Sequence, residues 1–175
     1  MKKILFAASE SVPFIKTGGL ADVVGSLPKY FVKEKYDVRV MLPKYMCMKD
    51  EWKEKLQYHT HFYMDLNWRK QYVGVLEMEY DGIKFYFIDN EYYFNGYAPY
   101  GDMYADIEKF AFFSKAVLSA LPLIDFRPDI IHCHDWQTGL VPIYLDNFRY
   151  GNEFYRGIKT VMTIHNLKFQ GTWDP

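Results

Sequence analysis

The stretch KKILFAASESVPFIKTGGLADVVGSLPKYF, residues 2–31, joins an apolar run to a long loop and then to a periodic apolar pattern. The run KKILFAA reads as a buried strand, because it is short and apolar and ends at polar residues. After the loop, apolar side chains recur at helical spacing, which predicts a helix from Leu20 to about Lys33 that Pro28 should kink or shorten. YDVRVMLP, residues 36–43, then reads as a second buried strand. The segment therefore predicts a βαβ unit.

The same alternation returns in the last third of the chain. PDIIHCHD (128–135) and IKTVMTIHN (158–166) read as strands, and TGLVPIYLDNF (138–148) between them reads as a helix. An earlier helix is predicted over 107–121, where Phe110, Phe113, Val117 and Leu121 share one face before Pro122. Strands and helices in this rhythm predict an α/β fold with a doubly wound, mostly parallel, Rossmann-like sheet.

The middle of the chain follows a different pattern. YHTHFYMDL (58–66), QYVGVLEMEY (71–80) and IKFYFIDN (83–90) are rich in residues that favour strands, and Asp81-Gly82 between the last two predicts a tight hairpin turn. These strands are expected to form an antiparallel β-hairpin excursion at the edge of the main sheet. NEYYFNGYAPYGDMYAD, residues 90–106, reads as a loop.

Length and composition narrow the class of protein. The 175 residues suit one domain with a substantial core, and the net charge of -1 without a long basic run argues against a nucleic-acid partner. Two cysteines make no disulfide framework, and the apolar run at the start is too short for a signal peptide or a membrane span. We therefore expect a cytoplasmic protein with no membrane partner. The 16 Tyr and 14 Phe either pack in the core or form flat surfaces on which sugar rings can lie.

Three polar segments follow the predicted buried strands, over 9–19, 132–139 and 165–171. Because ligands of doubly wound sheets bind outside the carboxyl ends of the strands, we expect all three segments to meet at one edge and to form the site.

The loop before the first helix combines Lys16 with Gly18 and Gly19. Glycines allow a ligand close to the backbone, and the N–H groups that open a helix attract anions, so the loop suits a phosphate or diphosphate. A flexible loop with a solvated lysine is the alternative. The sequence has neither the dinucleotide-binding motif G-x-G-x-x-G nor a P-loop. These absences argue against an NAD-dependent oxidoreductase and against an NTPase. Asp22 lies in the first turn of the predicted helix. It could have a purely structural role there, because a carboxylate near the amino end of a helix is stabilised by the helix dipole.

The segment HCHDWQTG places His132 and His134 on the same side of a strand. Nothing nearby completes a zinc site, so no metal is predicted. Asp135 is a candidate cap for the following helix. His165, just beyond a buried strand, is either a hydrogen-bonding residue of an active site or a structural loop histidine.

Taken together, KTGGLADVVGSLPK, HCHDWQTGLVPIYL and TIHNLKFQG resemble the motifs of bacterial glycogen synthases and plant starch synthases, in the same order. FIDNEYYF, YGD and EKFAFFSKAVL are similar to the segments that this family carries between them. The resemblance implies a retaining glucosyltransferase of the GT-B architecture, in which two Rossmann-like domains face each other across a cleft. Such enzymes move glucose from a nucleotide sugar to the non-reducing end of an α-1,4-glucan, without a cofactor.

The resemblance also implies roles for single residues. Lys16, Gly18 and Gly19 match the loop that meets the donor diphosphate, Asp22 matches the cleft aspartate, and His165 matches the histidine beside the transferred glucose. Asp135 and Trp136 match the HDW element of the cleft, with Gln137 where many relatives have His, and Tyr100 matches a cleft tyrosine on the acceptor side.

The family has a second domain that grips the nucleotide, whereas this chain has 175 residues. We therefore expect residues 1–175 to be a single N-terminal, acceptor-side domain, inactive alone, with the C-terminal nucleotide-binding domain absent. ADP-glucose is favoured over UDP-glucose as the donor. One alternative is a non-catalytic glucan-binding module, against which the diphosphate loop and His165 argue. Another is an unrelated Rossmann-like sugar-phosphate or nucleotide enzyme complete in this length, against which the lack of a further nucleotide fingerprint argues.

Overall fold

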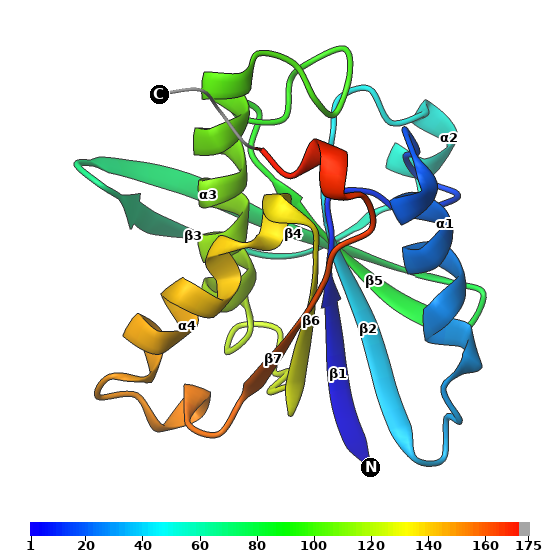
Figure 1. The fold of residues 1–175 in the computed structure, drawn as a ribbon, viewed down its shortest axis with the longest axis vertical. Coiled ribbons are helices and arrows are strands. Elements are labelled where there is room, and N and C mark those ends of the chain that lie inside the picture. Colours follow the sequence, from blue (N-terminus) through cyan, green and yellow to red (C-terminus); the bar gives the residue numbers. More distant parts are fainter. Residues whose placement is uncertain (172–175) are drawn as a thin grey trace.

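The computed structural model describes residues 1–171 of the protein. These residues are built around one seven-stranded sheet (Figure 1). The strands are β1 (Lys2–Ala7), β2 (Tyr36–Pro43), β3 (Gln57–Leu66), β4 (Arg69–Tyr80), β5 (Ile83–Asp89), β6 (Ile130–His134) and β7 (Lys159–Thr163). Their order is β3-β4-β5-β2-β1-β6-β7. The pairs from β5 to β7 are parallel, and β4 is antiparallel to β3 and to β5. The mostly parallel sheet is thus confirmed, and β3 and β4 form the expected antiparallel hairpin at its edge. The third strand of the predicted excursion, β5, was misplaced, because it pairs in parallel with β2 inside the main sheet.

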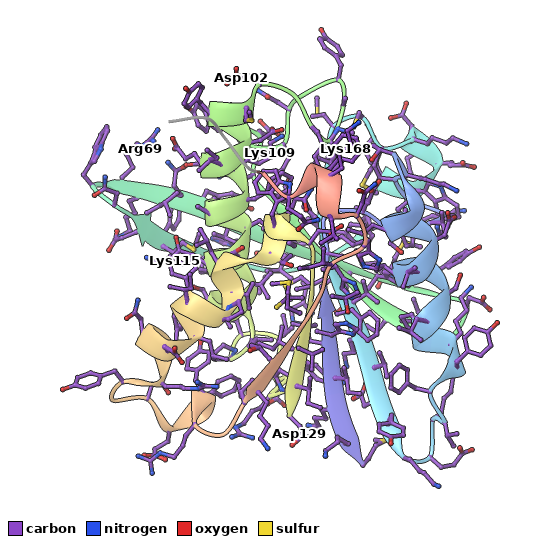
Figure 2. All side chains as sticks on the ribbon, viewed as in Figure 1. Arg69, Asp102, Lys109, Lys115, Asp129 and Lys168 are labelled. Carbon is purple, nitrogen blue, oxygen red and sulfur yellow. The ribbon has the colours of Figure 1, made fainter. Side chains whose placement is uncertain are left out.

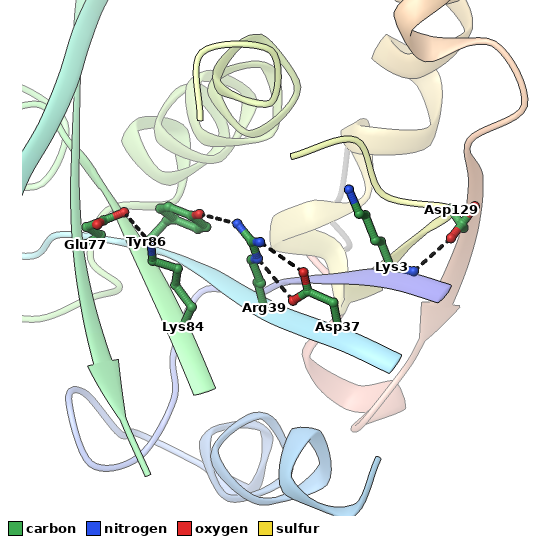
Figure 3. A network of polar contacts seen from close by, with 7 residues as sticks. All are labelled: Lys3, Asp37, Arg39, Glu77, Lys84, Tyr86 and Asp129. Carbon is green, nitrogen blue, oxygen red and sulfur yellow. Dashed lines mark hydrogen bonds and ion pairs between the residues drawn. The ribbon is translucent and has the colours of Figure 1, made fainter. Parts of the chain in front are cut away.

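Helices cover both faces of this sheet. The α-helices are α1 (Gly19–Ser26), α2 (Asp50–Lys53), α3 (Met103–Ala120) and α4 (Leu140–Arg149), and short 3-10 turns span Leu27–Tyr30, Trp136–Thr138, Glu153–Tyr155 and Leu167–Phe169. Helix α1 lies on one face, and α3 and α4 lie on the other (Figure 1, Figure 3). No helix within residues 1–171 is long and apolar enough to cross a membrane.

Two helix boundaries differ from the sequence prediction. Helix α1 ends at Ser26, and Pro28 lies in the 3-10 turn that follows, because proline has no N–H to continue the α-helical ladder. Helix α3 begins at Met103, four residues before the predicted start, because the Asp102 carboxylate caps it by accepting the Ala105 N–H at 3.1 Å. The predicted helix of 20–33 was therefore too long, and the predicted loop of 90–106 was too long as well.

The loop that carries the candidate diphosphate residues is anchored in the core. Phe14, from the middle of this loop, is 2% exposed and packs edge to face against Phe85 and Phe87 of β5 at centroid distances of 4.8 and 5.2 Å. Buried aromatic pairs of this kind add stability beyond the area that they bury. The loop therefore approaches the sheet at a fixed place before it enters α1.

A polar network ties the strands together near their amino ends (Figure 3). Arg39 of β2 donates to Asp37 at 2.9 and 3.1 Å and to the Tyr86 hydroxyl of β5 at 2.7 Å. The Lys3 N–H of β1 donates to the carboxylate of Asp129, the residue before β6, at 2.8 Å. Because these contacts satisfy one another at the end of the sheet opposite the candidate site, they are structural.

Candidate active site at the carboxyl ends of the strands

The three polar segments meet at the carboxyl edge of the parallel strands, as predicted. They form a pocket of about 770 Å³. Its lining residues are Glu10, Thr17, Gly18, Gly19, Leu20, Val23, Tyr100, Asp135, Trp136, Gln137, His165, Asn166 and Phe169. In the sheet, β1 lies between β2 and β6, so the strand order reverses here. The pocket therefore occupies the topological switch point, where doubly wound folds bind their ligands.

Six of the eight predicted site residues line this pocket: Gly18, Gly19, Tyr100, Asp135, Trp136 and His165. Lys16 and Asp22 are not among its lining residues. They form an ion pair instead, with Lys16 Nζ 2.8 Å from Asp22 Oδ1 and side chains 52% and 53% exposed. Lys16 directly precedes Thr17, which does line the pocket. A pair so open to water is worth little and can exchange with a ligand.

The two glycines of the loop are not required by packing within the described residues. Gly18 caps α1 with an extended backbone, φ -148° and ψ -168°, which any residue adopts. A Cβ at Gly19 would meet nothing within 4 Å, and one at Gly18 would meet only Glu10 Oε1 at 3.9 Å. The free space beside them therefore lies on the pocket side of the amino end of α1.

Glu10 is a pocket residue that sequence reasoning missed. It is 3% exposed, and its carboxylate accepts the Thr17 N–H and, at 3.1 Å, the Thr17 hydroxyl. Beside it, the Ser9 and Tyr100 hydroxyls lie 2.7 Å apart. Burial and the Glu10 carboxylate raise the pKa of Tyr100, so its phenol stays protonated. The only sequence signal was that polar residues directly follow an apolar strand.

Asp135 joins the ends of β6 and β7 and does not cap a helix. Its Oδ1 accepts the His165 N–H at 2.8 Å and the Gln170 amide at 2.9 Å. The predicted cap was wrong, because Asp135 has φ 57° and its side chain makes no capping hydrogen bond to the turn that follows. The Thr138 hydroxyl from that turn instead accepts the His134 N–H at 2.7 Å. Asp135 thereby fixes the backbone that carries His165.

His132 and His134 project from the same side of β6, as predicted, and their ring centroids are 4.2 Å apart. His134 Nδ1 lies 2.9 Å from His165 Nε2. The two rings are 18° from coplanar with centroids 5.2 Å apart, which is the geometry of a hydrogen bond in the ring planes. His134, fully buried, therefore holds the half-buried ring of His165 at the pocket.

The proton in this contact is assigned from burial. Burial, together with His132 and His165, lowers the pKa of His134 to about 3, so its ring is neutral. His134 Nε2 has no hydrogen-bond partner among residues 1–171, and a buried N–H without an acceptor is rarer than a buried acceptor without a donor. We therefore place the His134 proton on Nδ1, donating to His165 Nε2. His165 then carries its own proton on Nδ1.

His134 makes folding sensitive to acid. Its pKa falls from 6.5 in a free side chain to about 3 in the fold, so between these values the unfolded chain binds a proton that the folded chain excludes. The free energy of unfolding should then fall by about 1.4 kcal/mol per pH unit below pH ~6.5, and His134 should have no effect above it. Urea unfolding at pH 7.5 and 5.5 should show a smaller acid loss for His134→Gln than for the wild type. If the free energy of unfolding falls equally in the two proteins, the lowered pKa of His134 is contradicted.

Trp136 forms another wall of the pocket. Its ring packs edge to face on Phe110 of α3, with centroids 5.4 Å apart. Gly171 lies against it with φ +63°, and a Cβ there would come within 3.0 Å of the indole, so this position requires glycine.

A second hollow of about 550 Å³ adjoins the pocket and shares Tyr100 with it. Its other lining residues come from the loop before α3 and from the first turns of that helix. No group of three or more His, Cys, Asp or Glu within residues 1–171 is placed to hold a metal ion.

The sheet order and the pocket at its switch point define a Rossmann-like ligand-binding domain. The chain belongs to the family described as starch synthase catalytic domain, whose model matches residues 3–175. It is 72% identical to a glycogen synthase of Lachnoclostridium phytofermentans and 68% identical to one of Lachnospira eligens, each over 174 residues. Those matches cover 99% of this chain and 36% of each relative, so the chain spans about a third of the relatives' length.

Among solved structures, the catalytic domain of starch synthase IV from Arabidopsis thaliana, bound to ADP and acarbose, has a TM-score of 0.77 and 30% identity. The match covers 97% of this chain and 35% of that chain. The resemblance to glycogen and starch synthases, including the expected fold, is thus confirmed.

Proposed function

We propose that this domain supplies the acceptor side of a retaining glucosyltransferase, which transfers glucose from ADP-glucose to the non-reducing end of an α-1,4-glucan. The observation that carries the proposal is the pocket at the switch point. There, an open helix amino end and a positioned histidine face one space. An anion site beside a hydroxyl-binding site is what a nucleotide sugar requires.

The amino end of α1 is the proposed site of the donor diphosphate. Gly18 and Gly19 leave room beside the N–H groups that open the helix, and these groups favour an anion. Lys16 adds a cation when the diphosphate replaces Asp22 as its partner. As glucose leaves, negative charge grows on the diphosphate, and donors already in place stabilise it without reorganisation. Asp22, freed from Lys16, faces the cleft.

The rest of the pocket is the proposed site of the sugars. The His165 Nδ1–H and the Asp135 carboxylate at the ends of β6 and β7, and the Tyr100 hydroxyl beside Ser9, offer both donors and acceptors, which match sugar hydroxyls. Trp136 adds an apolar surface. We expect His165 to orient the transferred glucose and Tyr100 to contact the acceptor.

No protein nucleophile is required by this proposal. The acceptor hydroxyl attacks the anomeric carbon from the face that the diphosphate leaves. Because the new bond forms on the face from which the old one breaks, the configuration is retained. A donor phosphate oxygen takes the hydroxyl proton. The protein then contributes position and electrostatic stabilisation.

The donor is proposed to carry ADP. The Arabidopsis starch synthase IV domain is bound to ADP and acarbose, and these ligands support an ADP-linked donor and a saccharide acceptor here. Recognition of the base is expected to come from a second, C-terminal domain, with the present residues forming one N-terminal domain. Cys47 and Cys133 are free, which suits a cytoplasmic enzyme in a reducing compartment.

The isolated chain of 175 residues is expected to fold without measurable glucosyl transfer, because half of the donor-binding groups come from the other domain. Incubation with labelled ADP-glucose and a glucan primer measures incorporation, and circular dichroism checks the fold. The full-length enzyme that contains this segment is the positive control. Robust incorporation by the isolated chain would refute the half-site account. Glucan binding without transfer by the full-length protein would favour a binding module.

A further inference from the structure

Helix α3 carries a buried ion pair one turn from its start. Lys109 Nζ lies 2.5 Å from Asp106 Oδ1, at i,i+3 spacing, and the two side chains are only 11% and 7% exposed. Figure 2 shows Lys109 on the upper part of α3, close to the Asp102 end. Because two charges lose their hydration when they are buried, such a pair adds little stability over an apolar pair of similar volume.

Both members of the pair also bind the backbone of the preceding loop. Lys109 Nζ donates to the Pro99 carbonyl at 2.7 Å, and Asp106 Oδ2 accepts the Gly101 N–H at 2.9 Å. Tyr100 is the one residue between these contacts. Its side chain points to the pocket, where its hydroxyl lies 2.7 Å from that of Ser9.

The same face of α3 supports the ring of Tyr100. Phe110, the residue after Lys109, packs on Tyr100 at a centroid distance of 5.9 Å and on Trp136 at 5.4 Å. The backbone of the tyrosine is thus held on both sides and its ring is held from behind. A side chain fixed in this way before its ligand arrives loses less freedom on binding.

We propose that Asp106 and Lys109 are positioning residues that hold Tyr100 at the pocket by fixing the backbone on both of its sides. This inference rests on the proposed function, because it gives the Tyr100 hydroxyl its acceptor glucan. The pair touches no ligand and acts through Tyr100.

Paired substitutions separate positioning from stability. Removal of one partner would leave a lone buried charge and unfold part of the protein, so both are replaced together. Asp106→Leu/Lys109→Met removes both backbone contacts, and Asp106→Asn/Lys109→Met keeps an acceptor for the Gly101 N–H. Asp50→Leu/Lys53→Met is the matched control. Lys53 also pairs at i,i+3, with Asp50 at 2.9 Å, and donates to the Met46 carbonyl at 2.9 Å, without touching the pocket.

In the full-length enzyme, Asp106→Leu/Lys109→Met should raise the KM for glucan about tenfold and leave the KM for ADP-glucose unchanged. Its Tm should stay within about 4 °C of the wild type. Asp106→Asn/Lys109→Met should have a KM for glucan between those of the wild type and of Asp106→Leu/Lys109→Met. The control Asp50→Leu/Lys53→Met should have the KM values of the wild type. In a Tyr100→Ala background the same pair of changes should have almost no further effect, because residues that act through one another are not additive.

A normal KM for glucan in both variants, or an equal rise in the Tyr100→Ala background, would overturn the proposal. If Asp106→Leu/Lys109→Met does not fold, the milder Asp106→Asn/Lys109→Met decides, and a normal KM there has the same meaning. If the wild type transfers no glucose, the proposed function fails separately. Affinity electrophoresis in glucan gels then compares the same variants by binding alone, and equal mobility would overturn the positioning role.

Discussion

His165→Ala in the full-length enzyme is expected to lower kcat about 100-fold and to keep the fold, with the Tm lower by only a few degrees because the buried His134 N–H loses its acceptor. The loss is of the size seen when one preorganised donor is removed from an active site. The fold should survive, because Asp135 accepts the backbone N–H of residue 165, which alanine keeps. The ring itself is held by His134 at 2.9 Å, so no neighbour can replace it easily.

Kinetics and thermal unfolding measured on the same preparation test this expectation. His61→Ala is the matched control, because His61 is an exposed histidine of β3 outside the pocket. It should leave both quantities unchanged. A large fall in Tm of His165→Ala with normal activity of the folded fraction would show that the histidine is structural.

Lys16→Ala should lower kcat about 10- to 100-fold and leave glucan affinity unchanged. A charge-assisted contact is worth about 1.5–3 kcal/mol, and this one is expected to strengthen as the diphosphate leaves. Stability should change by less than about 1 kcal/mol, because the Lys16–Asp22 pair is half exposed. Lys16→Arg should recover part of the rate.

Lys29→Ala provides the control for Lys16. Lys29 also forms an exposed ion pair, with Asp81 at 2.5 Å and side chains 38% and 58% exposed, but lies outside the pocket. If the two alanine variants show the same kinetics, Lys16 has no place at the diphosphate site.

The framework of the fold was predictable from the sequence because it depends on local patterns. Apolar runs of five to eight residues mark strands, and Asp81-Gly82 marks a turn that the structure builds with φ 53° and 73°. The boundaries were less predictable, since they depend on single contacts. The start of α3 is decided by the Asp102 carboxylate, and the end of α1 by the turn around Pro28.

The site was predictable where a residue directly follows a strand or opens a helix, as for Gly18, Asp135 and His165. Contacts between distant segments were not. The His134–His165 hydrogen bond joins residues 31 positions apart. The closer Glu10–Thr17 and Lys109–Pro99 contacts follow no helix or strand spacing either. Lys16 and Asp22 were placed in the cleft by family motif, and the described structure pairs them with each other. Their proposed roles remain predictions.

Transfer of labelled glucose by the full-length enzyme to a short α-1,4-glucan of defined length tests the central claim most directly. With ADP-glucose as the donor, the product should be longer by single glucose units at the non-reducing end, each with the α configuration. UDP-glucose should react more slowly. Products of β configuration, or no incorporation from either nucleotide sugar, would contradict the account.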